Sequence, residues 1–297
     1  MCIKKRSEIL FCYDVTDANP NGDPLDENKP RIDEENKINI VTDVRLKRTI
    51  RDYLYEYKGY NGQDGKDIFV REIFLDNDPT KGIQDGKARA KDYDNNAENV
   101  LKECIDIRLF GGVIPLDKDS ITYTGPVQFK MGRSLHKVEL KHIKGTGAFA
   151  SKAGAKQATF REEYILPYSF ICFHGIINET AAKYTKLTES DVNELMDALW
   201  NGTKNLISRS KFGQMPRFLL KVTYKEPGFF IGDLDKKLKL TDYENDFAIR
   251  SIKDFKLNIE ELKKAFDDNK EHIEKIEYKV DSDLKLNLPE DWKEMQL

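Results

Sequence analysis

The sequence predicts an α+β fold, and three observations lead to this prediction. Apolar runs of strand length occur four times, at 8–15, 120–132, 162–178 and 216–224. One helix signal lies between the first two runs, and another lies between the last two. The chain has 297 residues, 39% of them apolar, which is enough for one large domain with insertions.

The first strand, EILFCYDV at 8–15, is mostly apolar and is therefore expected to be buried on both faces. A polar loop, 17–33, follows it, and a loop of this length in a compact domain is usually functional. A helix then begins at Thr42 or Asp43, because either side chain can cap it. Its apolar stripe is Leu46, Ile50, Tyr53, Leu54 and Tyr57.

Two insertions separate the middle strands. Residues 58–118 combine turn-forming sequences with the helical run AENVLKECIDIRLFGG, which predicts a mainly helical subdomain. Residues 133–161 are rich in Gly, Ala and Lys and poor in large apolar side chains.

A capping box at Thr188 and Asp191 predicts the second helix, which ends or bends at Gly202. The strand at 216–224 completes the order βαββαβ, the ferredoxin-like or RRM topology. Residues 225–297 hold two strand-like pieces and an acidic helix, with 14 Lys+Arg against 19 Asp+Glu. Because this extension lies outside the βαββαβ elements, we expect the domain to fold without it.

Composition excludes several functional classes. The formal net charge is −3, so any polyanion site must be a local basic patch. Four cysteines without paired spacing argue against a zinc site and fit the reduced thiols of a cytosol. No apolar run reaches transmembrane length, so we expect a cytoplasmic protein without a membrane partner.

The loop 17–33 and the helix after it form the first candidate binding surface. A helix start favours an anion, and Arg adds bidentate phosphate contacts. The alternative is a solvated helix face whose cations pair in part with Asp43, Asp52 and Glu56; the long loop favours binding. The basic side chains of this surface are Arg45, Lys47, Arg48 and Arg51.

Two further segments are basic. Residues 130–161 carry eight Lys and Arg against Glu139 alone, a balance of +7 that suits a polyanion, although a solvated loop has the same composition. In 205–218, basic residues surround Gly213, and binding and an ordinary basic loop are equally supported. These residues are Arg209, Lys211 and Arg217.

Catalytic signals are weak. The four histidines lack metal-ligand spacing, and His174 is interpreted as a structural strand residue, either packed or at the surface. Aspartates near the opening loop could hold Mg²⁺, but Asp is also a common turn residue, which favours the structural interpretation. We therefore predict no catalytic residue, no metal and no cofactor.

Several segments together resemble a known family. They are FCYDVTDANPNGDP, VTDVRLKRTIRDYL, DIRLFGG, TYTGPVQFKMGRSLHKV and LWNGTKNLISRSKFGQMPRFLL. These segments are similar to the backbone subunit of type I CRISPR effector (Cascade) complexes, the seventh family of CRISPR-associated proteins in the RAMP superfamily. The form resembles subtype I-B, although the I-C backbone shares the NPNGDP and VTDV…LKR signatures. The resemblance covers most of 8–224.

The resemblance implies an RRM-like palm, helical fingers and a β-hairpin thumb. Copies of such a subunit assemble along one CRISPR RNA with other Cascade subunits, and the guide pairs with target DNA. A separate helicase-nuclease cuts, so the resemblance implies that this chain is not an enzyme. The implied divisions are 1–57 (palm), 58–118 (fingers), 119–130 (palm strand), 131–161 (thumb), 162–224 (palm) and 225–297 (an extension packed on the palm).

The resemblance and the basic segments together predict a set of RNA-binding residues. Phe149 is the aromatic predicted to wedge between guide bases, and Phe160 is the weaker candidate. The predicted set is Asn21, Gly22, Arg31, Thr42, Arg45, Lys47, Arg48, Arg51, Arg133, Lys137, Lys144, Phe149, Lys152, Lys156, Arg209 and Lys211.

Two other functions stay open from the sequence. One is a metal-dependent ribonuclease that uses Asp23 or Asp26, as in the related type III backbone subunits. The other is a general single-strand RNA chaperone without a fixed guide.

Overall fold

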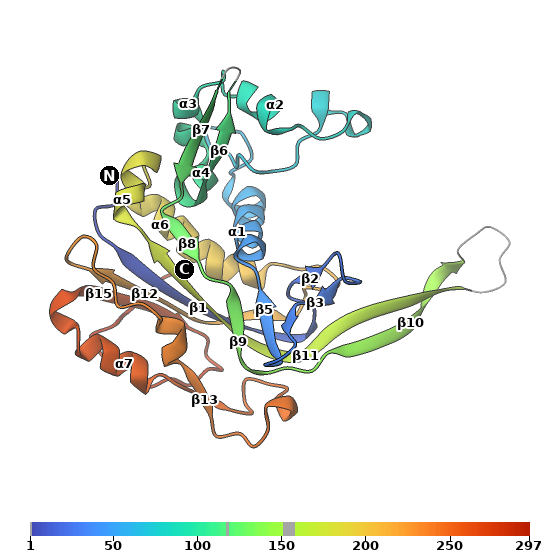
Figure 1. Cartoon of the computed structure of the whole chain (residues 1–297), viewed down its shortest axis with the longest axis vertical. Helices are drawn as coiled ribbons and strands as arrows, with labels where there is room; N and C mark the ends of the chain where they lie inside the picture. The colour runs from blue at the N-terminus through green and yellow to red at the C-terminus, as the bar shows by residue number, and fades with distance from the viewer. Residues whose placement is uncertain (1, 117–118, 151–157) are drawn as a thin grey trace.

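The computed structural model describes residues 2–116, 119–150 and 158–297, and the side chains of these ranges except those of residues 77, 146–150 and 158–160. The fold is a mixed arrangement of helices around one central sheet (Figure 1), as the predicted α+β class requires. The strand order along the sheet is β16-β15-β12-β1-β11-β9-β5-β4, and β8 and β10 also pair with β11. No helix of the described ranges is long and apolar enough to cross a membrane.

Strand β1 (Ser7–Ala18) lies at the centre of the sheet. It pairs antiparallel with β11 (Ala158–Ile177) and with β12 (Gln214–Tyr224). Successive side chains of a strand point to opposite faces, and here both faces are covered, because Ile9 and Leu10 belong to two different buried clusters. The prediction of a first strand buried on both faces is confirmed.

Helices α1 (Asp43–Lys58) and α6 (Glu189–Asp197) cover one face of the sheet, and α6 continues into η3 (Ala198–Gly202). Both helix starts agree with the sequence. Thr42 caps α1, and Thr188 and Asp191 form the capping box of α6. Leu46, Ile50 and Leu54 of the predicted stripe are buried in the cluster that holds Ile9 of β1, whereas Tyr57 is 59% exposed, so the buried stripe is shorter than predicted.

The C-terminal region covers the other face of the sheet. Strand β15 (Ile273–Val280) pairs with β12, and α7 (Glu260–Asp267) buries Leu262 and Phe266 in the cluster that holds Leu10 of β1. Figure 1 shows this region along one side of the sheet. The packing contradicts our expectation that the domain folds without 225–297, because removing the region would expose an entire buried face.

The strand predicted at 120–132 is three strands. β7 (Ser120–Thr124) pairs with β6 (Gly111–Pro115) in the insertion, whereas β8 (Val127–Phe129) and β9 (Gly132–Lys137) pair with β11. Gly125 makes the transition possible, because a Cβ there would lie 2.1 Å from the backbone of Phe110. The insertion therefore ends near residue 124 rather than 118.

The insertion has a small core of its own, formed by α2 (Gly86–Lys91), α3 (Ala97–Glu103) and α4 (Ile105–Phe110) with β6. Opposite it, β10 (Lys141–Ala150) and the first half of β11 form an arm that extends away from the body in Figure 1. The remaining elements are β2 (Gly22–Asp23), β3 (Lys29–Pro30), β4 (Ile32–Asp33), β5 (Ile38–Val41), η1 (Leu75–Asn77), η2 (Pro79–Lys81), α5 (Glu179–Thr185), η4 (Leu234–Lys237), β13 (Lys239–Thr241), η5 (Asp246–Ala248), β14 (Lys256–Asn258), η6 (Lys270–His272) and β16 (Lys293–Glu294).

Candidate nucleic-acid interface

The opening loop is fastened to the start of α1. The Asn21 side-chain oxygen accepts hydrogen bonds from the Thr42 backbone N–H at 2.8 Å and from the Thr42 hydroxyl at 2.9 Å. The Thr42 hydroxyl in turn accepts from the Arg45 N–H. Gly22 lies so close to Asn28 that a Cβ would be 2.0 Å from the Asn28 side-chain oxygen. Asn21, Gly22 and Thr42 therefore give the loop its shape.

Arg45 lies in the first turn of α1 with little access to solvent. Its Nη2 donates to the Thr49 hydroxyl at 3.0 Å, and its Nε is buried without a hydrogen-bond partner. Burial lowers the pKa of Arg45, and the distant Asp52 only partly offsets this effect.

Lys211 comes from the loop between η3 and β12 and is half-buried. Its Nζ donates to the Asn19 backbone carbonyl at the end of β1. Burial and the nearby charge of Arg45 lower the pKa of Lys211 to about 8. Two backbone hydrogen bonds fix this loop to β1, from the Thr16 N–H to the Gly213 carbonyl and from the Asn19 N–H to the Ser210 carbonyl.

Lys211 contacts Asn19, and Arg45 lies in the helix turn whose cap is bonded to Asn21, so both cations adjoin the same short stretch of the loop. We call them the Arg45–Lys211 pair. Within the described part of the chain, no carboxylate forms an ion pair with either of them. Two half-buried cations without a counterion repel each other, and an anion between them removes that cost. Charge-assisted hydrogen bonds to a phosphate would satisfy both groups.

The other predicted cations of α1 already have partners. Lys47 contacts Asp43 at 3.0 Å, and the exposed Arg48 contacts Asp52 at 2.6 Å. Arg51 forms an ion pair of 2.9 Å with the fully buried Asp106 of the insertion. Phosphate binding by these three residues stays a prediction, and each would have to exchange or share a carboxylate.

A cleft of about 420 Å³ lies between α1 and the insertion, lined in part by Arg48, Arg51 and Arg71. Arg71 is held by Asp67 at 2.9 Å. This basic lining is therefore largely neutralised, unlike the Arg45–Lys211 pair.

The basic balance of 130–161 does not describe the arm, because the adjacent residues of β11 are acidic. Lys144 contacts Glu162 at 3.4 Å, and Glu163 contacts both Arg161 and Arg209, at 2.6 and 3.0 Å. A count along the sequence stops at residue 161 and misses these neighbours. The +7 is therefore reduced where the arm meets the body.

The other residues predicted from the segment 131–161 lie in β9 or in the arm, and the structure describes only some of their side chains. Arg133 is 55% exposed and contacts Asp33 at 3.5 Å, and the side chain of Lys137 is exposed. The side chain of Phe149, and all of Lys152 and Lys156, lie outside the described residues. Their predicted contacts stay predictions, and so does the secondary candidacy of Phe160, whose side chain is likewise not described.

The acidic residues of the loop make turn contacts. Asp23 accepts from Arg31 at 2.6 Å and from the Leu25 N–H at 3.0 Å, and Asp26 contacts Lys29 at 2.7 Å. These contacts agree with the structural interpretation of the aspartates. Arg31 of the predicted set is thereby partly neutralised.

His174 is a packed strand residue, which agrees with its structural interpretation. Its Nε2 contacts the fully buried Glu8 at 2.7 Å, and its Nδ1 lies 3.3 Å from Asp235. Burial alone would lower the pKa of His174, but the two carboxylates outweigh it and raise the pKa. The group ties β1 and β11 to the C-terminal region.

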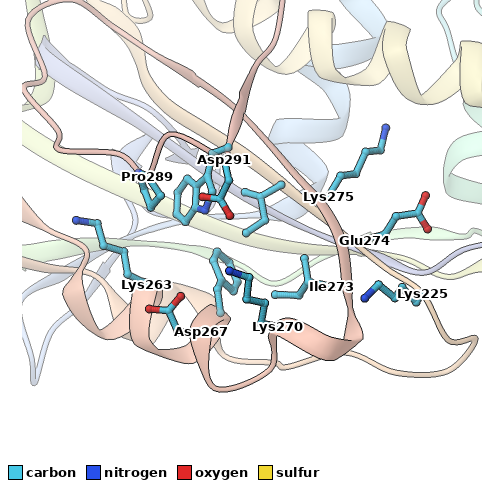
Figure 2. A pocket seen from close by; sticks show the side chains of 12 residues that line it. Lys225, Lys263, Asp267, Lys270, Ile273, Glu274, Lys275, Pro289 and Asp291 are labelled. Atoms are coloured by element: carbon cyan, nitrogen blue, oxygen red, sulfur yellow. The ribbon is translucent and has the colours of Figure 1, made fainter.

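A separate pocket of about 360 Å³ lies in the C-terminal region, among α7, β15 and residues 289–292 (Figure 2). Phe266 and Trp292 contribute apolar surface, and several lysines surround the opening. None of the predicted RNA-binding residues lines this pocket.

Sequence reasoning missed Asn19. Its backbone carbonyl holds Lys211, and its side-chain Nδ2 donates to the Asn28 carbonyl at 2.6 Å, across the loop. A backbone acceptor leaves no signal in residue types. The sequence also could not show that Arg45 and Lys211, which are 166 positions apart, adjoin the same part of the loop.

The fold and this site define an α+β protein with two half-buried cations beside a fixed loop and a helix start, and with a long hairpin arm. A family model for the CRISPR-associated protein Cas7 matches residues 5–260. A curated relative, the CRISPR-associated protein Cas7 of Haloferax volcanii, is 32% identical over 97% of this chain and 90% of its own length. The chain belongs to the Cas7 family.

Two solved structures share the fold. One is a chain of a "CRISPR RNA-guided surveillance complex, pre-nicking", with a TM-score of 0.60, 12% identity, and coverage of 98% of this chain and 96% of that one. The other belongs to a "CRISPR RNA-guided surveillance complex", with a TM-score of 0.56, 13% identity, and coverage of 98% and 95%.

Proposed function

We propose that this chain is the backbone subunit of a CRISPR RNA-guided surveillance complex of the Cascade type. Several copies bind one CRISPR RNA, contact one another and other subunits, and hold the guide for pairing with target DNA. The chain positions RNA and does not cut it. Membership of the Cas7 family supports this function, together with the shared fold.

The finer architecture belongs to the same proposal. The strand order β12-β1-β11-β9, with α1 and α6 on one face, supports a ferredoxin-like or RRM palm. The insertion with α2, α3 and α4 corresponds to the fingers, and the β10–β11 arm to the thumb.

The observation that carries the proposal is the Arg45–Lys211 pair. It lies beside a fixed loop and the start of a 16-residue helix, whose free N–H groups also favour an anion. A guide phosphate at this position would give both cations a counterion. Contacts of this kind hold RNA regardless of its sequence, which a guide holder requires.

The test is the RNA that co-purifies with the assembled complex. We expect repeat-flanked spacer RNA with the wild type and strongly reduced RNA with Arg45→Gln/Lys211→Gln. The matched control is Lys253→Gln/Lys264→Gln, which removes two charges at exposed positions of the C-terminal region. RNA of random origin would support the chaperone function instead, and equal RNA in both double variants would contradict the site.

A further inference from the structure

Exposed apolar residues are sequence neighbours of both members of the Arg45–Lys211 pair. Val44 directly precedes Arg45 and is 67% exposed, and Phe212 directly follows Lys211 and is 69% exposed. Ile207, in the same loop as Phe212, is 67% exposed. Large apolar side chains in contact with water lose the stabilisation that burial gives. Exposed apolar residues next to two cations are therefore candidates for a ligand-binding surface.

The exposure of Phe212 does not come from a loose loop. The Phe212 N–H donates to the Ser208 carbonyl at 2.8 Å, and the Lys211 N–H donates to the same carbonyl at 3.1 Å. On the other side, the Gly213 carbonyl accepts from the Thr16 N–H of β1 at 3.2 Å. The backbone therefore directs Lys211 inward and leaves the neighbouring ring in solvent.

A ligand for this arrangement has an anionic part and a flat apolar part. A free phosphate or a phosphorylated side chain would use the cations and leave the ring exposed. A nucleotide uses both, because its phosphate binds cations and its base stacks on an aromatic ring. Stacking does not depend on the identity of the base, which suits a guide of variable sequence.

We propose that Phe212 is a stacking platform for one guide base per subunit, next to the phosphate held by the Arg45–Lys211 pair. This inference rests on the proposed function and adds a base contact to it. Phe212 lies in the loop between η3 and β12, which contacts the arm through Arg209 and Glu163, and it is a different residue from the wedge predicted at Phe149.

The experiment uses the full-length chain and single-stranded RNA that carries 2-aminopurine at successive positions. A base that stacks on Phe212 loses fluorescence. We expect quenching at one position per bound subunit with the wild type and with Phe212→Trp. Quenching at that position should fall about five-fold or more with Phe212→Ala, as removal of a stacking contact implies.

Two further variants keep the result interpretable. Phe212→Leu stays apolar without an aromatic face and should behave like Phe212→Ala. Tyr184→Ala removes an aromatic side chain of the same exposure, 69%, on α5 and should behave like the wild type. Because Phe212 and Tyr184 are both 69% exposed, we expect all of these variants to fold, and circular dichroism checks this.

Equal quenching in wild type and Phe212→Ala would overturn the proposal. So would a Phe212→Ala variant that quenches normally but fails to assemble, because the ring would then contact a neighbouring protein. Absence of RNA binding by the wild type would instead overturn the proposed function, so the two failures are distinguishable.

Discussion

Asn21 in the opening loop and Thr42 at the start of α1 are joined by two hydrogen bonds. The side-chain oxygen of Asn21 accepts both, one from the Thr42 N–H and one from the Thr42 hydroxyl. A single side chain thus couples the shape of the loop to the first turn of α1. The segment between Asn21 and Thr42 is long because it forms four short strands, β2, β3, β4 and β5, before it reaches the helix start.

Two substitutions of Asn21 separate shape from charge. Asn21→Ala removes both accepted bonds and should lower the free energy of unfolding by about 1–2 kcal/mol. Asn21→Asp keeps an acceptor and should preserve that stability, yet its negative charge should weaken RNA binding. Urea unfolding and filter binding measure the two effects. Equal loss of RNA binding in both variants, with equal stability, would contradict the assigned role.

Lys211 gives RNA binding a dependence on pH. Its pKa in the free protein is about 8, whereas a bound phosphate favours the charged form, so binding takes up a proton. Affinity should therefore fall as pH rises from 7 to 9, by roughly tenfold per site. The stability of the RNA-free protein changes in the opposite direction. Its free energy of unfolding should rise as pH increases above 8, because the half-buried lysine then loses its unfavourable charge. Lys211→Arg should bind RNA without this pH dependence, and a dependence that survived it would belong to another group.

Substitution of Arg51 can separate a structural role of this residue from a role in RNA binding. Its partner Asp106 is fully buried and also accepts from the N–H groups of Phe69 and Val70. Arg51→Ala leaves that carboxylate unpaired and should cost roughly 3–5 kcal/mol of stability. Arg48→Ala breaks an exposed pair with Asp52 and should cost about 0–1 kcal/mol.

The salt dependence of RNA binding distinguishes the two roles of Arg51. A phosphate contact, as predicted from the sequence, would lower the salt slope by about one unit when Arg51 is removed. We expect an unchanged slope for protein that remains folded at low temperature. A lowered slope would show that Arg51 exchanges Asp106 for RNA.

The Glu8–His174–Asp235 group predicts a stability optimum in mild acid. The folded pKa of His174 is above 6.5, so its contribution is complete below pH 6.5 and is lost as pH rises through the folded pKa. For Glu8 and Asp235, burial would raise the pKa, but the hydrogen bonds and charges around them outweigh it. Their contributions are complete above pH 4.5 and are lost as pH falls through the lowered values.

Thermal unfolding across pH 4–9 measures this effect. Relative to the wild type, His174→Gln should be less stable near pH 6 and should lose less stability toward pH 9. A constant difference between the two proteins at every pH would contradict the charged form of His174.

Truncation after residue 224 should give unfolded or aggregated protein. The C-terminal region supplies Leu262, Phe266 and β15 to the second face of the sheet, and Glu8 is buried by contacts with the N–H groups of Ile231 and Gly232. Circular dichroism and gel filtration test this. A folded monomer of 1–224 would restore the interpretation that we drew from the sequence.

Local signals in the sequence predicted local structure well. The caps at Thr42 and Thr188 and the buried strand β1 followed from residue types at short spacing. The break at Gly125 was missed because it depends on the backbone of Phe110. The acidic helix predicted in 225–297 covers only Glu260–Asp267, and Ile273–Val280 forms β15, which pairs with β12.

The candidate site divides in the same way. The composition identified the basic residues but not their ion-pair partners. Asp106 lies far along the chain from Arg51, and Glu163 lies just beyond the basic segment 130–161. Arg45 and Lys211 stand out because they form no ion pair among the described residues, and ion pairing can be seen only in the folded structure.

Both broad surfaces of the central sheet are closed, one by α1 and α6 and the other by the C-terminal region. RRM domains present an open sheet with aromatic side chains and recognise a few bases there. In this protein, that mode of recognition is blocked by its own C-terminus. In the arrangement that we propose, the guide is held at the margin of the sheet mainly through its phosphates, so most of its bases stay free to pair with a second strand.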